Sequence, residues 1–316
     1  MSTMMALRAH QRGGPETLVY EESPLPTRPG QGEVLVAVRA AAITFDELTW
    51  PETWEVDGVD RTPVIPSHEF SGVVTEIGPD VDDLAVGDAV FGLVPFDRDG
   101  AAAELVTVPS ANVAHKPASV SHVTAAAAVL PALTAWEALV DHAELQSGQR
   151  LLIHGGAGSV GSFLIQWAKT LGAYVAVSAP SRHVETVRGL GADHVIVTDQ
   201  AARTDQTPPF DAAINAVGAD TPEWLFAAVR RGGVVISLQE PADAAMADRH
   251  GVRAIFFVVT ARKERLRKLA SLLGSHAFQV EVADSFPLAE GRAAYDRGGP
   301  RRKPGKTVLI VGNPDE

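Results

Sequence analysis

The sequence predicts an α/β protein in which a doubly wound parallel sheet is joined to a second, mostly β domain. Three observations support this. The chain has 316 residues, about twice the length of a usual single domain. Its first hundred residues consist of short β-rich segments between turn residues. From about residue 121, short apolar strands alternate with amphipathic helices, as in βα units.

The first part of the chain has the alternation of half-buried strands. Val34, Val36 and Val38 alternate with less apolar neighbours, as expected for a strand with one face in a core. Glycine-containing turns at residues 78–80 and 87–88 separate the segments that follow. We therefore expect a small, mostly antiparallel β domain with strands at residues 32–38, 70–77, 89–92 and 103–108.

The later part predicts six parallel strands, a number that fits a doubly wound sheet. One helix with leucines at helical spacing and two further strands follow this sheet, which suggests a return of the chain to the first domain. The expected domains are therefore 1–119 with 262–316, and 120–261. The six strands are expected at 150–153, 174–177, 194–197, 211–215, 234–238 and 253–259, the helix around 266–273, and the two last strands at 278–282 and 307–311.

Composition narrows the function. The chain is 46% hydrophobic and 21% charged, with a formal net charge of -12. This charge repels nucleic acids and anionic membranes, so we expect a small-molecule partner and neither a nucleic-acid nor a membrane partner. There is no cysteine, which excludes disulfides, thiolate nucleophiles, cysteine-ligated zinc and iron–sulfur clusters. No targeting segment and no run of roughly 18 apolar residues stands out, so a cytoplasmic location is expected.

A glycine motif is the strongest chemical signal. Gly156, Gly158 and Gly161 follow the strand expected at 150–153 and open an amphipathic helix that ends before Gly172. The absence of side chains lets the backbone turn tightly, approach a pyrophosphate and pack the helix against the strand, while the helix N-terminus favours the negative charge. The alternative is a glycine-rich turn without a ligand.

The residues after the second strand favour NADPH over NADH. An NAD-binding fold needs an acidic residue about 20 positions after the glycine motif, to bind the ribose hydroxyls. Here the strand leads into Ser178 and Arg182, and the first acid is Glu185. Hydroxyls and a guanidinium suit a 2′-phosphate, which a carboxylate would repel. The alternative for Arg182 is a solvent-facing residue at the start of a helix.

Several motifs together resemble the medium-chain dehydrogenase/reductase superfamily, and within it the zinc-free NADPH:quinone oxidoreductase-like branch. The resemblance implies a GroES-like catalytic domain built from both ends of the chain around a Rossmann domain, with the active site in the cleft between them. The motifs are AAAI at 40–43, IPSHEFSGVV at 65–74, VGDAVFG at 86–92, LTAW at 133–136, HGGAGSVG at 154–161, LGADHVI at 190–196 and GKTVL at 305–309.

The resemblance also implies which residues line the NADPH. They come from the glycine motif and from the ends of the neighbouring strands. The expected residues are Thr134, Gly156, Gly158, Ser159, Val160, Gly161, Ser178, Arg182, Asn215, Val217, Leu238, Phe257 and Val258.

Zinc-dependent relatives place a cysteine near the position of Thr44 and a histidine at the position of His68. This chain keeps the histidine but has no cysteine, and one histidine beside Glu69 cannot complete a tetrahedral site, so we expect no metal. We expect Glu69 to pair with a cation such as Lys306. His68 is either a structural residue that lines a pocket or a chemical one.

Without a metal, direct hydride transfer suits quinones and alkenes conjugated to a carbonyl. Thr44-Phe45 replaces the Asn-Pro that is usual in quinone oxidoreductases, which leaves the substrate open. We expect hydride addition to the β-carbon, with the enolate held by hydrogen bonds and protonated by water or a hydroxyl. Thr44 and His68 are the candidate catalytic residues. Trp50 and Trp54 are candidates to stack on a flat substrate or, alternatively, to be buried aromatics of the β domain.

Other functions stay open at this point. One is a dedicated enoyl reductase of natural-product biosynthesis, and another is a non-catalytic NADPH-binding protein. The apolar segment 255–259 fits either a last strand that pairs with its twin in a homodimer, as in relatives, or a buried central strand of a monomer.

Overall fold

The computed structural model describes residues 3–198, 209–218, 220–298 and 303–312. The chain divides into two compact units, Met1–Leu130 with Thr260–Glu316, and Pro131–Val259. The expected boundary at 119/120 therefore differs from the observed one at 130/131, because helix α2 (His122–Trp136) begins within the first unit. Ala126 and Ala127 of this helix pack in one apolar cluster with residues of that unit's sheet.

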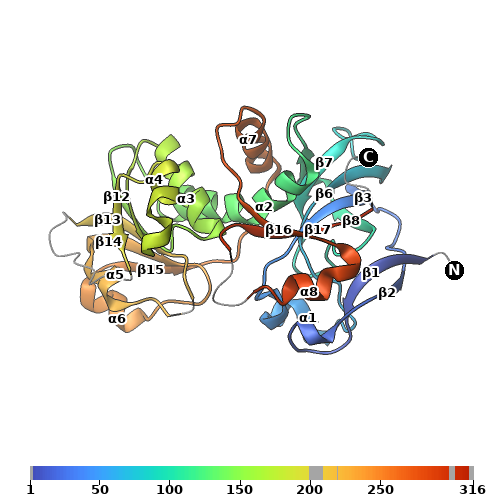
Figure 1. The fold of residues 1–316 in the computed structure, drawn as a ribbon, viewed down its shortest axis with the longest axis horizontal. Helices are drawn as coiled ribbons and strands as arrows, with labels where there is room; N and C mark the ends of the chain where they lie inside the picture. Colours follow the sequence, from blue (N-terminus) through green and yellow to red (C-terminus); the bar gives the residue numbers. More distant parts are fainter. Residues whose placement is uncertain (1–2, 199–208, 219, 299–302, 313–316) are drawn as a thin grey trace. The chain divides into compact units, whose positions relative to one another are not determined.

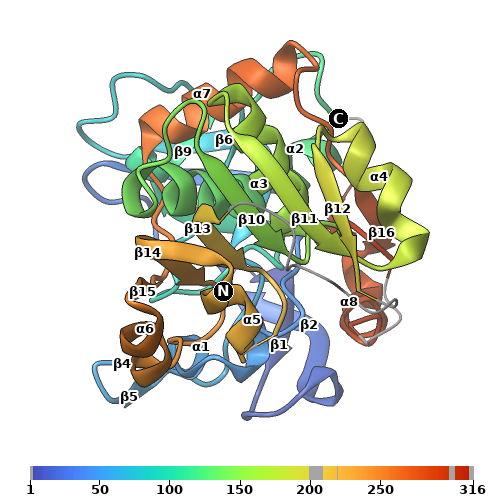
Figure 2. The ribbon, with the colours of Figure 1, turned by 90° about the vertical axis from the view of Figure 1, so that its left-hand side faces the viewer.

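The unit of residues 131–259 contains the expected doubly wound parallel sheet. Its strand order is β12-β11-β10-β13-β14-β15, and Figure 2 shows the strands side by side. The order reverses between β10 and β13, which is the point where α/β sheets bind ligands. The bounds are β10 Arg150–His154, β11 Tyr174–Ala179, β12 His194–Val197, β13 Phe210–Asn215, β14 Val229–Ser237 and β15 Arg253–Phe256.

The strands of this sheet are apolar because helices cover them. Leu152, Ala213 and Val235 are fully buried at the centre of the sheet. The last strand was expected to reach residue 259 but ends at Phe256; the ring of the next residue, Phe257, packs 4.5 Å from the ring of His142. The helices are α3 Ser159–Thr170, α4 Val184–Gly189, α5 Glu223–Ala227 and α6 Ala244–His250, and a π-helical segment, Glu137–His142, follows α2.

The other unit is built on a seven-stranded sheet with the order β16-β17-β3-β6-β7-β9, in which β8 also pairs with β3. The unit also contains the hairpin β1–β2 and helices α1, α7 and α8, which Figure 1 labels, and the hairpin β4–β5, which Figure 2 labels. The bounds are β1 Thr3–Ala9, β2 Leu18–Pro24, β3 Glu33–Ala42, α1 Pro51–Trp54, β4 Glu55–Val56, β5 Val59–Asp60, β6 Glu69–Ile77, β7 Ala89–Leu93, β8 Leu105–Pro109, β9 Val113–His115, α7 Lys263–Gly274, β16 Val282–Pro287, α8 Gly291–Tyr295 and β17 Lys306–Ile310.

The prediction of a strand at residues 278–282 was wrong in its position. The observed strand is β16, Val282–Pro287, because pairing with β17 sets its position: Val282 lies opposite Lys306, and Pro287 opposite Ile310. Phe278, which suggested the earlier start, is instead a buried side chain with 6% exposure. Both ends of the chain therefore contribute strands to one sheet.

One helical stretch is long and apolar enough to cross a membrane, although no such stretch was expected from the sequence. His122–His142 has 21 residues and a mean hydropathy of 1.6, enough by length and composition to cross a membrane. Of its most apolar window, 67% is buried inside the protein. A buried core helix can have the same length and hydropathy, so these two properties are weak evidence for a membrane span.

Candidate functional site

The glycine motif lies at the carboxyl edge of the parallel sheet. His154, the last residue of β10, is in register with Ser178 of β11 on one side and with Asn215 of β13 on the other. Asn215 in turn is in register with Ser237 of β14. Because parallel strands end at the same edge, the expected cofactor residues after β10, β11, β13 and β14 come together there.

The three glycines of the motif have different steric reasons. A Cβ on Gly156 would lie 2.0 Å from Cγ1 of Val177 in β11, and one on Gly161 would lie 2.2 Å from the carbonyl oxygen of Gly155. These two glycines allow the loop, strand and helix to pack. A Cβ on Gly158 would meet nothing closer than 3.5 Å, which is ordinary van der Waals contact. The protein itself does not need a glycine at 158, so this position fits a ligand that approaches the backbone closely.

Helix α3 begins directly at this glycine and offers donors to an anion. Gly158 is its N-cap residue, and the first helical positions are Ser159, Val160 and Gly161. The first N–H groups of a helix have no partner within it, and the first turn here contains no acidic side chain that would compete for them. The motif therefore fits the diphosphate of a nicotinamide nucleotide.

Two expected cofactor residues use their side chains inside the protein. Ser178 is 1% exposed, and its hydroxyl lies 2.5 Å from Nδ1 of His154 and accepts from the N–H of Gly155 at 3.3 Å. Asn215 is 1% exposed; its Nδ2 donates to the hydroxyl of Thr221 at 3.1 Å, and its Oδ1 accepts from the N–H of Val217. Both side chains hold the loops that follow the strands.

Arg182 is exposed after β11, as the NADPH hypothesis requires. Its Nε donates to Nε2 of His183 at 3.1 Å, so this imidazole accepts and is neutral on that nitrogen. Burial, and then the charge of Arg182, lower the pKa of His183. Arg182 therefore provides a permanent positive charge 24 residues after Gly158. No acidic residue lies in the sequence between the end of β11 and Arg182.

The other expected cofactor residues are spread over several elements. Thr134 is half-buried in α2, Leu238 is half-buried after β14, and its N–H donates to the carbonyl of Asn215 at 3.3 Å. Val217 and Val258 are 46% and 53% exposed. Large exposed apolar side chains near a ligand edge are consistent with a surface that a bound molecule covers.

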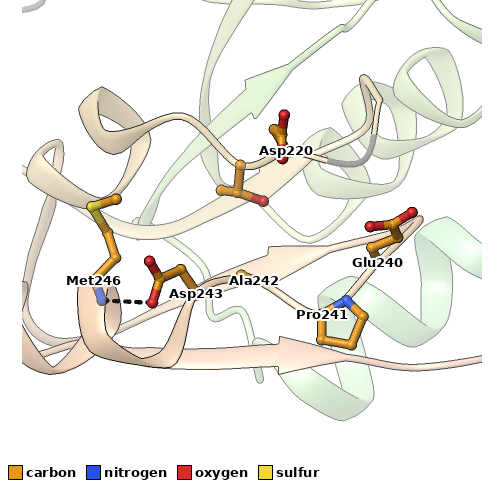
Figure 3. A pocket seen from close by; sticks show the side chains of 7 residues that line it. Asp220, Glu240, Pro241, Ala242, Asp243 and Met246 are labelled. Carbon is orange, nitrogen blue, oxygen red and sulfur yellow. Dashed lines mark hydrogen bonds between the residues drawn. The ribbon is translucent and has the colours of Figure 1, made fainter.

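A hollow of about 390 Å³ lies beside this edge, between the loops after β13 and β14 (Figure 3). None of the expected site residues lines it. Its acidic lining is unsuited to phosphate, and one of its carboxylates, Asp243, accepts from the N–H groups of Ala245 and Met246 as the N-cap of α6. The lining residues are Asp220, Thr221, Glu240, Pro241, Ala242, Asp243 and Met246.

In the other unit, three adjacent strands bring Thr44, Glu69 and Lys306 together. Glu69 pairs with Lys306, which confirms the expected partner, and the two side chains are 1% and 7% exposed. Lys306 Nζ also donates to Oγ1 of Thr44 at 2.9 Å, and Glu69 Oε2 accepts from the N–H of Leu130 at 3.0 Å. Burial raises the pKa of Glu69, and the ammonium of Lys306 opposes that increase.

A second buried carboxylate, Glu47, was not expected from the sequence. It is 1% exposed and accepts from the N–H of Thr44 at 3.2 Å, from the N–H of Ser67 at 2.9 Å and from the hydroxyl of Tyr295 at 2.5 Å. Burial raises its pKa to about 7. Glu47 thus fixes the backbone on which Thr44 sits and the residue before His68. The Thr44-x-x-Glu47 spacing, typical of a capping box, was the available signal.

His68 is buried, at 5% exposure, and its Nδ1 has no hydrogen-bond partner. Burial, followed by the charge of Arg61, lowers its pKa to about 4, so the imidazole is neutral near pH 7. Its ring packs 4.9 Å from that of Phe96, which also contacts the edge of Trp50 at 5.8 Å. A buried polar atom without a partner is rare and fits a ligand that supplies one.

Trp54 requires a correction. It was a candidate to stack on a substrate, but it is 2% exposed, belongs to the apolar core of its unit, and donates its indole N–H to the carbonyl of Leu48 at 2.9 Å. The alternative expectation, that Trp54 is a buried aromatic of the β domain, is confirmed. Trp50 is half-buried and keeps surface that a small molecule could cover.

Zinc does not fit this group of side chains. Glu69 is already neutralised by Lys306, and an ammonium beside the carboxylate would repel a divalent cation. Thr44 offers a neutral hydroxyl, not the thiolate that zinc prefers. Within the described ranges, no group of three or more His, Asp or Glu side chains could hold a metal ion.

A doubly wound sheet with this glycine motif, in a chain that also has a β unit with buried polar side chains, defines a nicotinamide-dependent oxidoreductase. Family models agree: residues 30–118 match the alcohol dehydrogenase GroES-like domain, and residues 190–309 match the family described as zinc-binding dehydrogenase. The chain belongs to the medium-chain dehydrogenase/reductase superfamily and is quinone-oxidoreductase-like.

Individual relatives give the same result. The chain is 36% identical to the bovine protein named NAD(P)H oxidoreductase RTN4IP1, mitochondrial, over 80% of this chain and 72% of that one. It is 30% identical to the polyketide synthase GfsB of Streptomyces halstedii over 89% of this chain, which corresponds to 5% of that protein. The solved quinone oxidoreductase of Coxiella burnetii is 27% identical, with a TM-score of 0.86 over 98% of this chain and 100% of that one. The protein is therefore an NAD(P)H-binding oxidoreductase.

Proposed function

We propose that the protein is an NADPH-dependent reductase that transfers a hydride to a quinone or an α,β-unsaturated carbonyl without a metal. The observation that carries this proposal is the trio of Thr44, Glu69 and Lys306. In this trio the ammonium of Lys306 pairs with the carboxylate of Glu69 and donates to the hydroxyl of Thr44, so the group offers hydrogen-bond donors where a metal would have no room for its charge. Substrates that are already activated need no Lewis acid, and such donors stabilise the oxyanion that forms from them.

In this proposal each unit has one task. The glycine motif and the first turn of α3 hold the diphosphate, and Arg182 binds the 2′-phosphate that distinguishes NADPH from NADH. The bound cofactor supplies a hydride to the β-carbon of the substrate. Thr44 and the neutral His68 donate hydrogen bonds to the developing enolate, and Trp50 covers a flat substrate.

The test is a panel of quinones and enones with NADPH and with NADH, after exhaustive treatment of the protein with a chelator. We expect oxidation of NADPH in the presence of at least one acceptor, weaker use of NADH, and no loss of rate on chelation. Loss of turnover that added zinc restores would contradict the metal-free reaction. Equal affinity for both nucleotides would contradict the role of Arg182.

A second candidate is a dedicated enoyl reductase of natural-product biosynthesis, because the similarity to a polyketide synthase spans 89% of this chain. This function predicts turnover of an enoyl thioester and poor turnover of simple quinones. A non-catalytic NADPH-binding protein would bind the nucleotide and reduce no acceptor in the panel.

Two further proposals concern assembly and location. The edge strand β15 carries Phe256 at 39% exposure, and we infer a homodimer in which this edge meets its twin. Sedimentation measurements test this. We also keep the cytoplasm as the proposed compartment, although the bovine relative is named as mitochondrial; fractionation of cells that express the full chain tests it.

A further inference from the structure

The feature of interest is the Thr44–Glu69–Lys306 trio and the direction of its hydrogen bonds. Thr44 follows β3, Glu69 begins β6 and Lys306 begins β17, and β3 lies between the other two strands. Glu69 and Lys306 are 1% and 6% exposed, whereas Thr44 is half-buried. Thr44 is therefore the member of the trio that keeps surface for a small molecule.

The contact with Lys306 fixes what the Thr44 hydroxyl can do. An ammonium only donates, so Oγ1 of Thr44 is the acceptor in the 2.9 Å contact. The hydroxyl donates its own proton to Oε1 of Glu69 at 3.4 Å, longer than a normal O–H···O hydrogen bond. This hydrogen bond is therefore weak, and the closer ammonium, 2.9 Å from Oγ1, makes the hydroxyl a stronger acid.

The backbone of Thr44 is fixed as well. Its N–H donates to Glu47 at 3.2 Å, and its carbonyl accepts from the N–H of Glu47 at 3.0 Å. The next contact along the strand, from the N–H of Ile43 to the carbonyl of Thr307 at 3.0 Å, keeps β3 against the start of β17. Side chain and backbone are both held, as a proton donor requires.

We propose that Lys306 acts through Thr44 to complete the reduction of a conjugated carbonyl, with the Thr44 hydroxyl as the group that protonates the enolate. This inference rests on the proposed function and adds its proton donor. The O–H bond of Thr44 breaks as a C–H bond forms at the α-carbon of the enolate. Oγ1 takes a proton from Nζ of Lys306, which becomes neutral and regains a proton from water after product release.

This assignment separates two kinds of substrate. Protonation of an α-carbon is slow and benefits from a positioned acid, whereas a reduced quinone takes its protons on oxygen, where exchange with water is fast. Removal of the donor should therefore affect enones much more than quinones. A purely structural role for Thr44 would affect both substrates equally.

The experiment compares Thr44→Val, Thr44→Ser and a matched control, Thr49→Val. Thr49 lies on the same loop, is exposed, and donates to the carbonyl of Asp46 outside the trio. For Thr44→Val we expect the ratio of enone to quinone turnover to fall by about 100-fold, the usual contribution of a general acid. Thr44→Ser should restore most of it, and Thr49→Val should leave the ratio as in the wild type.

A stereochemical measurement adds a readout that a structural role would not move. In deuterium oxide, an enone with a methyl group on its α-carbon gains a deuterium there. NMR of the product should show one configuration with the wild type, because a fixed group delivers the proton. Thr44→Val should give a mixture, because water then approaches from both faces.

A further readout needs neither cofactor nor turnover. Para-nitrophenol binds as a planar analogue of the enolate, and its absorbance reports its ionisation. We expect the wild type to stabilise the phenolate and Thr44→Val to weaken its binding about tenfold, the value of one charge-assisted hydrogen bond. The double variant Lys306→Met with Glu69→Leu leaves no unpaired buried charge and should weaken it as well.

The outcomes are distinguishable. If the wild type reduces neither quinones nor enones, the proposed function fails, and this inference fails with it. If the wild type reduces enones but Thr44→Val changes both substrates equally, or keeps a single product configuration, the proposed function stands and the assignment of Thr44 is overturned.

Discussion

The two units build their sites from different materials. The site in residues 131–259 consists mostly of backbone: glycines and helix N–H groups at the end of a parallel sheet, with the buried side chains of Ser178 and Asn215 used to hold loops. The site in the other unit consists of buried ionisable side chains from distant segments, above all Glu47, Glu69 and Lys306. A backbone site should be sensitive to added atoms, and a side-chain site to lost charges.

The largest expected effect is on the side-chain site. Lys306→Met leaves the carboxylate of Glu69 buried and unpaired, so the free energy of unfolding should fall by about 3–5 kcal/mol. Urea denaturation measures this. Adding Glu69→Leu removes the orphaned charge and should recover most of the loss. If the single variant is as stable as the wild type, the pair does not organise this unit.

The next effect sharpens the description of the backbone site. Gly161→Ala places a Cβ against the carbonyl of Gly155, so we expect a loss of about 1–3 kcal/mol in stability together with weaker NADPH binding. Gly158→Ala meets no close atom, so stability should stay near the wild-type value while NADPH affinity falls at least tenfold. Thermal denaturation and fluorescence titration separate the two. Unchanged affinity in Gly158→Ala would argue against the diphosphate cradle.

A smaller effect is expected from the one charge that the backbone site uses. Arg182→Ala should weaken NADPH binding about tenfold and leave NADH binding unaffected, because only NADPH carries the 2′-phosphate. Titration with both nucleotides at low and high salt measures this, and the difference should shrink with salt. Arg188→Ala is a matched control, because Arg188 pairs with Glu185 at 3.0 Å. Equal loss for both nucleotides would assign Arg182 to the shared diphosphate.

The smallest effect is a pH dependence of the side-chain site. The pKa of Glu47 is raised from 4.5 to about 7, so its contribution to stability is present below pH 4.5 and is lost as the pH rises through about 7. His68, with a pKa lowered from 6.5 to about 4, acts in the opposite direction: its contribution is present above pH 6.5 and is lost as the pH falls through about 4.

Comparing variants isolates each group. Glu47→Gln cannot ionise, so the difference in unfolding free energy between wild type and this variant should change across the interval from pH 4.5 to about 7 and be flat above it. His68→Asn should change the slope only on the acid side. Tyr295→Phe removes one hydrogen bond to Glu47 and serves as a milder perturbation of the same carboxylate. Parallel curves for wild type and Glu47→Gln would contradict the assignment.

The difference between the units also explains what the sequence predicted well. Five of the six strands of the parallel sheet were expected within three residues, because buried strands form short apolar runs and a glycine motif marks the first turn. The sixth, β14, was expected from residue 234 but begins at Val229. The hairpin β1–β2 was missed, since its second strand, Leu18–Pro24, carries Glu21 and Glu22 and lacks a regular alternation. Strand β16 begins later in the sequence than expected, because its pairing with β17 and not its own hydrophobic pattern determines where it starts.

Side-chain sites are harder to predict for a physical reason. The Glu69–Lys306 pair was predicted because both residues lie in motifs that resemble a known family. Glu47 and Tyr295 were missed, because a carboxylate without a cation normally indicates a solvated position, and only the folded chain shows that a tyrosine 248 residues away satisfies it. Trp54 was misplaced because a tryptophan in a core and one in a pocket have the same local sequence.

The position of β17 has a consequence for biosynthesis. A ribosome has made more than three hundred residues before Lys306 appears, yet the strand that this lysine begins must insert between β16 and β3. Until then the carboxylate of Glu69 lacks its counter-charge, and residues 40–42 of β3 lack the strand that pairs with them on one side. The contiguous unit of residues 131–259 can fold as soon as it has been made, whereas the discontinuous one must wait until β17 has been made, so its exposed surface needs chaperones most during this interval.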